Sequence, residues 1–558
     1  MAAAVEHDAP RRVVSPDRAF PTLDEAEMDL LRPLARELTY DNGEVLFRAG
    51  DRDIDFLVVV SGAIDIRNPT NNNALVVTHT AGHFVGDIDL LTRRPVIVSA
   101  VTRGPTRVLR LPGAELRKLL NTIPRISEKL LVAFQVRREM LQAAGVAGIR
   151  VVGPGSCKDT NVVREFLHKN FVPFTWYDSD NADGKEQLAR FGSPRKSPVI
   201  ECNDGRVLIN PSLHELATCA GVWQGCPEEE FDLAVVGAGP AGMTAAVYAA
   251  SEGLRTIVLD RLGPGGQAGG SSRIENFIGF PAGLSGADLA RRAVLQMLKF
   301  GASMVAPVNV RKLIPAASDN APHVLELDCG NQLRTQAILI ATGACWRKLE
   351  APGAERFFQA GVYYACTSVE GYLYRGQDVA VIGAGNSAGQ AVMFLAEHCA
   401  RNVHMIIRGP ALGPGMSEYL AERIRATPNI HVHTSSEITE VHGSRRIEEV
   451  TLTPKSGAAP SRLAVAAVFV FIGAEPNISW LPETLARDKL GYLLTGVDLV
   501  KAGAWHVPGR EPCPLETSIP RVLAAGDVRA GSTKRVGFAV GDGSLAVTCV
   551  HRLRAAIV

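Results

Sequence analysis

The chain of 558 residues is too long for one hydrophobic core, and about 150 residues per domain predicts three or four domains. Lys and Arg number 59 and Asp and Glu number 58, so the net charge of +1 gives no electrostatic basis for binding nucleic acid or an anionic membrane. The N-terminus lacks the apolar run of a signal peptide, and the longest apolar run, residues 463–474, is too short to cross a bilayer. These features predict a cytoplasmic protein.

The ten cysteines are scattered along the chain and never occur as Cys-x-x-Cys. This spacing argues against a zinc ribbon and against the disulfide framework of a secreted domain. We therefore predict no metal site.

The first block of the chain covers residues 1–145. Between residues 47 and 111, short β-forming runs alternate with Gly- and Asn-rich turns, which predicts an antiparallel sandwich or β-roll. Helices are expected on both sides, over residues 23–36 and 113–142. No helix-turn-helix pattern follows, so a DNA-binding regulator is not expected.

Two segments of this block, FRAGDRDIDFLVVVSGAIDI and FVGDIDLLTRRPVIVSAVT, resemble the cyclic-nucleotide-binding β-roll of catabolite-activator-type proteins. The resemblance implies a Gly-Glu pair and an arginine that hold the cyclic phosphate. Here the pair is Gly86-Asp87 and Val96 stands at the arginine position, with Arg93 and Arg94 as candidate substitutes. Losing such a charged pair costs about 2–5 kcal/mol. The resemblance thus implies a cyclic nucleotide at this domain, while Val96 argues against one.

The second block, residues 146–228, reads as strand, helix, strand, helix, hairpin and helix. This order resembles thioredoxin and glutaredoxin domains. The family's Cys-x-x-Cys position reads Cys157-Lys-Asp-Thr160, one thiol short, and Ser197-Pro198 stands where a cis-proline is expected. Cys157 is a weak catalytic candidate, and a structural or docking role is favoured for this segment.

The third block, from Glu229 onward, contains two glycine-rich turns, each between a strand and a helix. The first, GAGPAG at 237–242, is followed by Asp260 at the end of the next strand. Its glycines allow a tight turn and the approach of a pyrophosphate, and the helix N-terminus offers N–H donors to the phosphates. An acid at position 260 is suited to accept a hydrogen bond from a ribose hydroxyl. This pattern predicts a bound dinucleotide.

The second turn, GAGNSA at 383–388, is followed by Arg408 instead of an acid at the end of the next strand. A guanidinium can pair with a 2′-phosphate, so NADPH is favoured over NADH. The alternative is that Arg408 is only a solvated strand end.

With two dinucleotide sites, residues 229–558 resemble bacterial thioredoxin reductases of low molecular weight, in the pyridine nucleotide-disulfide oxidoreductase family. The matching segments include GGQAGGSSRIENFIGFPAGLSG, ILIATGA and VLAAGDVRAGSTKRVGFAVGDGSLA. The resemblance implies an FAD domain in two parts, 229–346 and 476–558, an inserted NADPH domain, 347–475, and a homodimer. The predicted fold class is multidomain α/β: an N-terminal β-roll, a thioredoxin-like segment and a flavoprotein with two dinucleotide-binding domains.

The turns and the resemblance together assign residues to two cofactors. The residues assigned to FAD are Gly237, Gly239, Ala241, Gly242, Asp260, Gly266, Gln267, Asn276, Gly526, Asp527, Lys534 and Arg535. NADPH is assigned Gly383, Gly385, Asn386, Ser387, Ala388 and Arg408. A helix starting near Gly541 is expected to direct its N-terminal donors at the flavin.

The active dithiol of the family maps to YYACTSVEG at 363–371, where Cys366 takes the first cysteine's place and Val369 the second's. A valine cannot form a thiolate, and one thiol cannot close an intramolecular disulfide. Cys366 is therefore a catalytic candidate that lacks a partner thiol. The alternative, equally favoured, is that Cys366 is only a small buried residue. Exchange with Cys157 is a further alternative.

Two functions follow from these features. The first is an NADPH-dependent FAD oxidoreductase of thioredoxin-reductase type, with an incomplete dithiol and a regulatory N-terminal half. Its electron acceptor stays open between a thioredoxin-like protein, a small disulfide and oxygen. The second is a non-catalytic flavin- or NADPH-responsive sensor.

Overall fold

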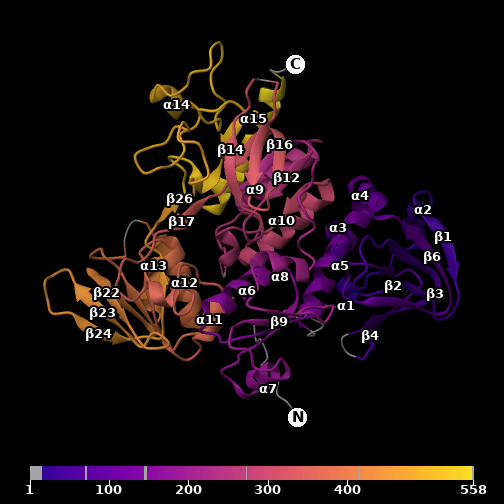
Figure 1. The fold of residues 1–558 in the computed structure, drawn as a ribbon, viewed down its shortest axis with the longest axis horizontal. Coiled ribbons are helices and arrows are strands. Elements are labelled where there is room, and N and C mark those ends of the chain that lie inside the picture. Colours follow the sequence, from indigo (N-terminus) through magenta and orange to yellow (C-terminus); the bar gives the residue numbers. More distant parts are fainter. Residues whose placement is uncertain are drawn as a thin grey trace.

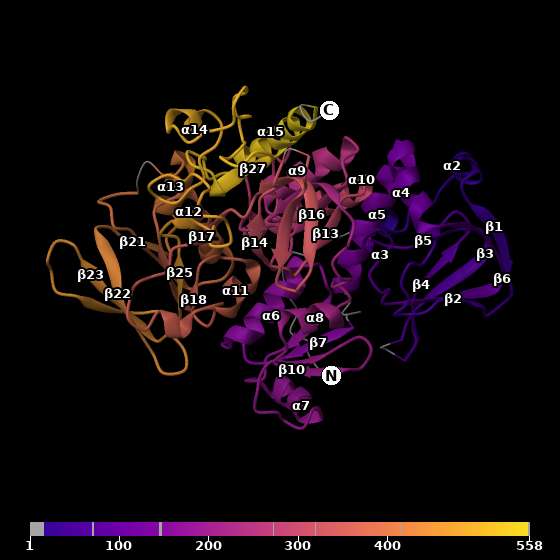
Figure 2. The same cartoon turned by 45° about the horizontal axis from the view of Figure 1, so that its top comes forward.

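The computed structural model describes residues 16–69, 72–143, 148–271, 273–318, 320–412 and 415–555, without the side chains of residues 16, 114, 141–143, 368 and 369. The β-roll lies at one side of the molecule and the three-stranded sheet β22–β24 at the opposite side (Figure 1). Between them lie the sheet with β11 and β16 and, next to it, the unit with α6, α7 and α8 (Figures 1 and 2). Within the described part of the chain, no helix is long and apolar enough to cross a membrane.

The roll is an antiparallel sheet in the order β1-β6-β3-β4, with β2 paired to β6 and β5 to β3. Its strands are β1 (Arg36–Tyr40), β2 (Val45–Phe47), β3 (Phe56–Asn68), β4 (Ala74–Thr80), β5 (Phe84–Val85) and β6 (Ser99–Leu111). Its helices are α1 (Pro16–Ala19), α2 (Glu25–Leu31), α3 (Asp89–Thr92), α4 (Gly113–Thr122) and α5 (Pro124–Ala143).

The roll differs from the sequence prediction in three places. The helix expected to reach residue 36 ends at Leu31, and β1 begins at Arg36. The helix expected over 113–142 is two helices, because Pro124 has no N–H to continue the first one. The short runs expected within β3 form one strand through Gly62, whose φ of +86° favours glycine.

The thioredoxin-like unit has the order of elements predicted from the sequence. A four-stranded sheet runs β10-β9-β7-β8, with β7 and β8 parallel and the other pairs antiparallel. The elements are β7 (Ile149–Val152), α6 (Lys158–Lys169), β8 (Phe174–Tyr177), α7 (Ala182–Arg190), β9 (Val199–Glu201), β10 (Val207–Ile209) and α8 (Leu213–Cys219). The Ser197-Pro198 peptide is cis, as expected. A disulfide joins Cys202 to Cys219, a pair that the cysteine spacing did not predict.

The next sheet runs β13-β12-β11-β16-β15-β14, with β27 paired to β16. Its strands are β11 (Phe231–Val236), β12 (Thr256–Leu259), β13 (Ser303–Val305), β14 (Val310–Ile314), β15 (His323–Leu327), β16 (Gln332–Ile340) and β27 (Val522–Ala524). Helices α9 (Pro240–Ser251), α10 (Gly286–Phe300) and α15 (Val536–Ala555) pack beside it. Because β27 comes near the end of the chain, the residues of another domain lie between β16 and β27 in the sequence.

The intervening sheet runs β18-β25-β19-β20-β21 and is parallel. Its strands are β18 (Val362–Tyr363), β19 (Asp378–Ile382), β20 (Asn402–Ile406), β21 (Ile430–His433) and β25 (Ala467–Val470), with helices α11 (Ser368–Leu373), α12 (Asn386–His398) and α13 (Glu418–Ala426). A second sheet consists of β22 (Ser436–His442), β23 (Glu449–Pro454) and β24 (Ser461–Ala464). Where the chain enters and leaves this domain, β17 (Ala344–Trp346) pairs with β26 (Ala474–Pro476).

Candidate functional site

The first glycine turn connects β11 to α9 and contains two glycines at which a side chain would collide with the backbone. Gly237 has φ +110°, and a Cβ there would lie 2.4 Å from the carbonyl oxygen of Ala341. A Cβ on Gly242 would lie 2.0 Å from the carbonyl oxygen of Gly237. Gly239, the N-cap of α9, is different: its φ is −77°, and the nearest atom to a Cβ would be the Cα of Gly266 at 3.9 Å. The space in front of Gly239 is therefore open, at the end of the helix where backbone N–H groups lack intrahelical partners.

Asp260 lies beside this turn and holds it in place. One carboxylate oxygen accepts from the Ala238 N–H at 2.8 Å, and the other accepts from the N–H groups of Leu262 and Gly263 at 2.9 Å. The carboxylate therefore joins the turn to the loop after β12.

Segments far apart in sequence converge on the same turn. A Cβ on Gly266 would lie 2.9 Å from the Cα of Gly239, and one on Gly526 would lie 3.2 Å from the Cβ of Ala241. Asp527 follows directly, and burial raises the pKa of its carboxyl, an effect that Lys534 opposes. The structure thus brings Gly237, Gly239, Ala241, Gly242, Asp260, Gly266, Gly526 and Asp527 together.

The remaining flavin candidates lie more peripherally. Gln267 donates from Nε2 to the Ala344 carbonyl, at the connection between the two nucleotide-binding domains. Lys534 donates from Nζ to the Tyr492 hydroxyl at 2.5 Å. Asn276 and Arg535 are exposed. The helix expected near Gly541 begins earlier, at Val536, as part of α15.

The second glycine turn, between β19 and α12, repeats the geometry of the first. Gly383 has φ +141°, and a Cβ there would lie 2.5 Å from the Phe471 carbonyl oxygen. Gly385 has φ −96°, and the nearest atom to its Cβ would be the Gly415 carbonyl oxygen at 3.9 Å. This turn also has open space in front of its second glycine.

The other residues assigned to the second nucleotide lie around this turn. Asn386 accepts on Oδ1 from the Ser417 N–H at 2.7 Å, Ser387 is exposed, and Ala388 is buried. Arg408 is exposed two residues beyond the end of β20.

Cys366 is buried, and position 369, where the resemblance implied a second cysteine, is a valine. The Cys366 side chain is 5 % exposed, and burial raises the pKa of the thiol well above its usual value, an effect increased by Glu370 and Cys399. The side chain of Val369, in α11, lies outside the described residues. A thiol that remains protonated at neutral pH is a poor nucleophile.

The thioredoxin-like unit packs against the segment that contains Cys366. Asn161 of α6 donates from Nδ2 to the Gln359 carbonyl at 2.7 Å, and the Lys158 ammonium lies 5.3 Å from the centre of the Phe358 ring. In both ribbon views α6 lies beside α11 (Figures 1 and 2). Cys157, the half-buried N-cap of α6, is therefore at this interface.

The other end of α6 contacts the loop after β12, which lies against the first glycine turn. Lys169 donates from Nζ to the Gly266 carbonyl at 3.1 Å, and Asn170 donates from Nδ2 to the Leu262 carbonyl at 2.8 Å. One helix thus joins both nucleotide-binding domains. The sequence did not predict these contacts, since polar residues on a helix give no signal that distinguishes an interface from solvent.

In the β-roll, the region of the predicted phosphate cassette is occupied by the protein's own side chains. Val96 is 6 % exposed and packs in the apolar core of the roll with Phe47, Val59 and Ile64. A valine in this core has no charge to offer a cyclic phosphate.

Two arginines of α5 bind the cassette. Arg137 donates to the Gly86 carbonyl at 2.7 Å, and Arg138 pairs with Asp87 at 3.4 Å and Asp89 at 3.1 Å. Burial raises the pKa of Asp89 to about 7, although Arg138 opposes the shift. The acid of the Gly-Asp pair therefore already has a cationic partner.

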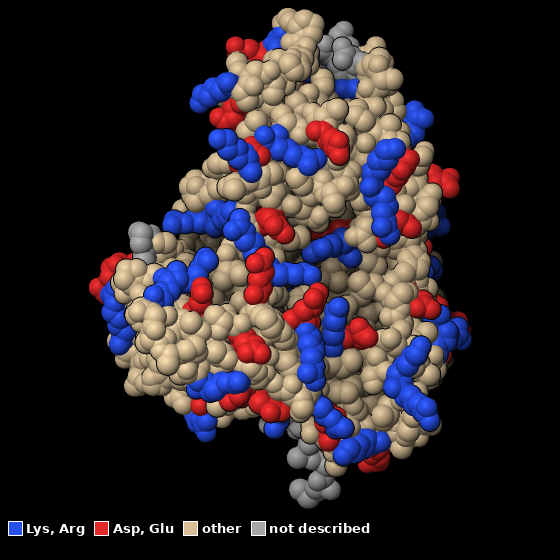
Figure 3. Space-filling view, turned by 60° about the vertical axis from the view of Figure 1, so that its left-hand side comes forward, with Lys and Arg blue, Asp and Glu red and all other residues tan. Residues whose placement is uncertain are grey.

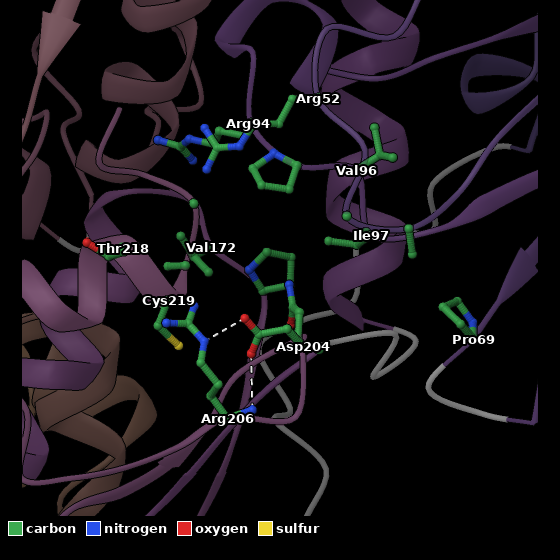
Figure 4. Close-up of a pocket in the computed structure, with 18 of the residues that line it drawn as sticks. Arg52, Pro69, Arg94, Val96, Ile97, Val172, Asp204, Arg206, Thr218 and Cys219 are labelled. Carbon is green, nitrogen blue, oxygen red and sulfur yellow. Dashed lines mark hydrogen bonds and ion pairs between the residues drawn. The ribbon is translucent and has the colours of Figure 1, made fainter. Parts of the chain in front are cut away.

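A cavity of about 310 Å³ lies between the roll and the thioredoxin-like unit (Figure 4). Arg52, Arg94 and Val96 line it from the roll, and Thr218 and Cys219 line it from the other unit. Arg94 donates to the Asn170 carbonyl at 2.6 Å, whereas Arg93 is exposed. The cavity is thus between domains and does not occupy the interior of the roll.

On the face shown in Figure 3, basic and acidic side chains are interspersed. Many form ion pairs, such as Arg423 with Glu397 at 2.8 Å.

Comparison with known proteins identifies two parts of the chain. Residues 231–543 match the pyridine nucleotide-disulphide oxidoreductase family, and residues 37–123 match the cyclic nucleotide-binding domain. These matches confirm the predicted flavin oxidoreductase and the predicted N-terminal roll.

Individual relatives match about three fifths of the chain. The 34.2 kDa protein in the rubredoxin operon of Clostridium pasteurianum is 32 % identical over 325 residues, 58 % of this chain and 97 % of that protein. NADH dehydrogenase of Bacillus subtilis is 31 % identical over 343 residues, 61 % of this chain and 62 % of the relative. The match to this second relative therefore leaves more than a third of its length uncovered.

Among solved structures, thioredoxin reductase of T. acidophilum is 27 % identical, with a TM-score of 0.52, over 59 % of this chain and 100 % of that one. Three observations support the same assignment: the paired glycine turns, the sheet completed by β27, and the family match over more than half of the chain. The chain belongs to the pyridine nucleotide-disulphide oxidoreductase family.

Proposed function

We propose that this protein is an NADPH-dependent FAD oxidoreductase of thioredoxin-reductase type, with an incomplete dithiol and a regulatory N-terminal half. The observation that carries the proposal is the pair of glycine turns, each with open space in front of the second glycine. Such a turn lets a pyrophosphate reach the backbone N–H groups of the following helix.

The residues present fit both cofactors. Around FAD we place the converging cluster of Gly237, Gly239, Gly266, Gly526 and Asp527, with Asp260 holding the turn beside it. When bound, FAD would supply an acceptor for a hydride from the nicotinamide. The protein's contribution is to hold the two nucleotides and to exclude water around them.

NADPH is proposed at the second turn, because Arg408 lies near the end of β20 with its guanidinium exposed to solvent. A guanidinium can pair with the 2′-phosphate that distinguishes NADPH from NADH.

The electron acceptor is proposed to be reduced without a Cys-x-x-Cys pair. Cys366 is buried, its thiol has a raised pKa, and α6 packs beside its helix. These features favour a small disulfide or oxygen over a thioredoxin-like protein as acceptor.

The regulatory role of the N-terminal half rests on α6. Because this helix contacts both nucleotide-binding domains, a shift of the thioredoxin-like unit changes contacts at both. A cyclic nucleotide at the roll would reach this unit through their shared cavity, although Val96 argues against that ligand. We also propose a cytoplasmic location, from the composition of the chain.

We further propose a homodimer. Tyr248 of α9 and Leu545 of α15 are 46 % and 40 % exposed, on helices that pack together. Exposed apolar side chains on neighbouring elements suit a protein interface, and light scattering in solution tests this.

The test has two steps on the purified protein: NADPH is first added under anaerobic conditions, and steady-state kinetics are then measured. We expect a flavin spectrum that NADPH bleaches and that returns when air reoxidises the flavin. The rate of thioredoxin reduction should be far below that of an enzyme with a dithiol. Val369→Cys restores Cys-x-x-Cys and should increase thioredoxin reduction, while the double variant with Cys366→Ser should not. A brisk thioredoxin reductase activity of the wild type that Cys366→Ser abolishes would contradict the proposal. Flavin binding with no NADPH consumption, whatever the acceptor, would instead favour the non-catalytic sensor.

A further inference from the structure

Cys226 and Cys329 lie next to each other although 103 residues separate them in the sequence. Cys226 is in the segment that joins α8 to β11, and Cys329 is in the turn between β15 and β16. Their sulfur atoms are 3.2 Å apart. A disulfide bond is about 2.05 Å long, so an approach of roughly 1.2 Å would bond them.

The pair lies where the thioredoxin-like unit meets the flavoprotein part. Both cysteines are half-buried and pack on the apolar core behind β11 and β16. Trp223 packs on that same core and on the core of the thioredoxin-like unit. A bond between the two sulfurs would therefore tie the connecting segment to the flavoprotein sheet.

We propose that Cys226 and Cys329 are a redox-sensitive thiol pair that a small organic disulfide oxidises to a disulfide bond, which fastens the thioredoxin-like unit to the flavoprotein part. The reaction balances without a further oxidant. One protein thiolate attacks the small disulfide and releases one small thiol. The second protein thiolate attacks the resulting mixed disulfide and releases the other small thiol.

The surroundings of the pair affect its rate of exchange. Burial and the neighbouring thiol raise the pKa of Cys226 to about 12, so this thiol is protonated at neutral pH and exchanges slowly. This pair is separate from Cys366, so it is independent of how the flavin is reoxidised.

The chain offers a direct test, because exposed Glu228 and Glu229 lie between Cys226 and β11. The intact protein is incubated with oxidised glutathione or left reduced, its remaining thiols are blocked, and it is cut briefly after glutamate. On a denaturing gel we expect the N-terminal and C-terminal parts to stay joined only after oxidation, and to separate on adding reductant. Peptide mapping should find a Cys226–Cys329 cross-link that is lighter by two hydrogens than the separate peptides.

Three variants sharpen the result. Cys226→Ser and Cys329→Ser should each abolish the joined product, while Cys157→Ser, at a half-buried cysteine of the thioredoxin-like unit, should leave it unchanged. Separation of the parts after oxidation, with glutathione on either cysteine and no cross-link, would overturn the proposal. So would a joined product that persists in Cys226→Ser. If a serine variant fails to fold, peptide mapping of the oxidised wild type decides the question.

Discussion

Gly239→Ala should weaken the binding of FAD without unfolding the protein. Gly239 has φ −77°, which alanine adopts freely, and the nearest atom to the new methyl would be 3.9 Å away. The effect on stability should therefore stay below about 1 kcal/mol, the cost of alanine at an N-cap. The methyl would, however, occupy the open space in front of the turn, where we place the pyrophosphate.

The magnitude follows from the hydrogen bonds at the helix end. Displacing the pyrophosphate by a methyl loses at least one charged hydrogen bond, worth about 1.5–3 kcal/mol. This corresponds to a roughly ten- to hundredfold weaker affinity for FAD. Titration of the flavin-free protein with FAD, followed by flavin fluorescence, measures the affinity, and thermal unfolding of the flavin-free protein measures the stability.

Two matched variants separate this effect from general damage. Gly385→Ala makes the same change in the second turn, so it should retain FAD and bind NADPH more weakly. Gly253→Ala introduces backbone strain at φ +84° in open space, and it should leave the affinity for both nucleotides unchanged. The assignment of the two turns is refuted if Gly239→Ala binds FAD like the wild type, or if Gly385→Ala loses FAD.

Four further expectations can be checked separately. Arg408→Glu should lower the preference for NADPH over NADH about ten- to hundredfold, because one guanidinium–phosphate pair is worth roughly 1.5–3 kcal/mol; unchanged selectivity in steady-state kinetics would make Arg408 a solvated strand end. Cyclic AMP should bind weakly or not at all, since Val96 packs in the core of the roll; a micromolar Kd by calorimetry would contradict this. Cys366 should react with Ellman's reagent more slowly than half-buried Cys157, because burial raises its pKa; equal rates in peptide-resolved labelling would show an accessible thiolate. The free energy of unfolding should fall as the pH drops from about 6.5 to 4, because burial lowers the pKa of His323 to about 4 and the unfolded chain therefore binds a proton at higher pH than the folded protein does. In His323→Gln, urea unfolding should show a free energy of unfolding that falls less over this pH range, by up to roughly 3 kcal/mol. An unchanged dependence on pH in this variant would exclude His323 as a cause.

The sequence alone was sufficient for the parts of the protein that local chemistry encodes. The two glycine turns, the strand before each and the helix after each were predictable, because backbone conformation and phosphate approach restrict residue choice at Gly237 and Gly383. The family and the three-part architecture were predictable for the same reason. The absence of a Cys-x-x-Cys pair around Cys366 was also evident, since residue 369 is a valine.

Tertiary structure decided everything that depends on residues distant in sequence. The joining of β3 and β6 into continuous strands depends on their pairing with each other, and the convergence of Gly526 on Ala241 depends on β27 returning to the first sheet. The burial of Cys366, the contacts of α6 with both nucleotide-binding domains and the approach of Cys226 to Cys329 gave no signal in the sequence. The sequence does not distinguish a buried cysteine from an exposed one. Only packing against other segments determines whether a thiol is shielded from solvent or placed beside a second sulfur.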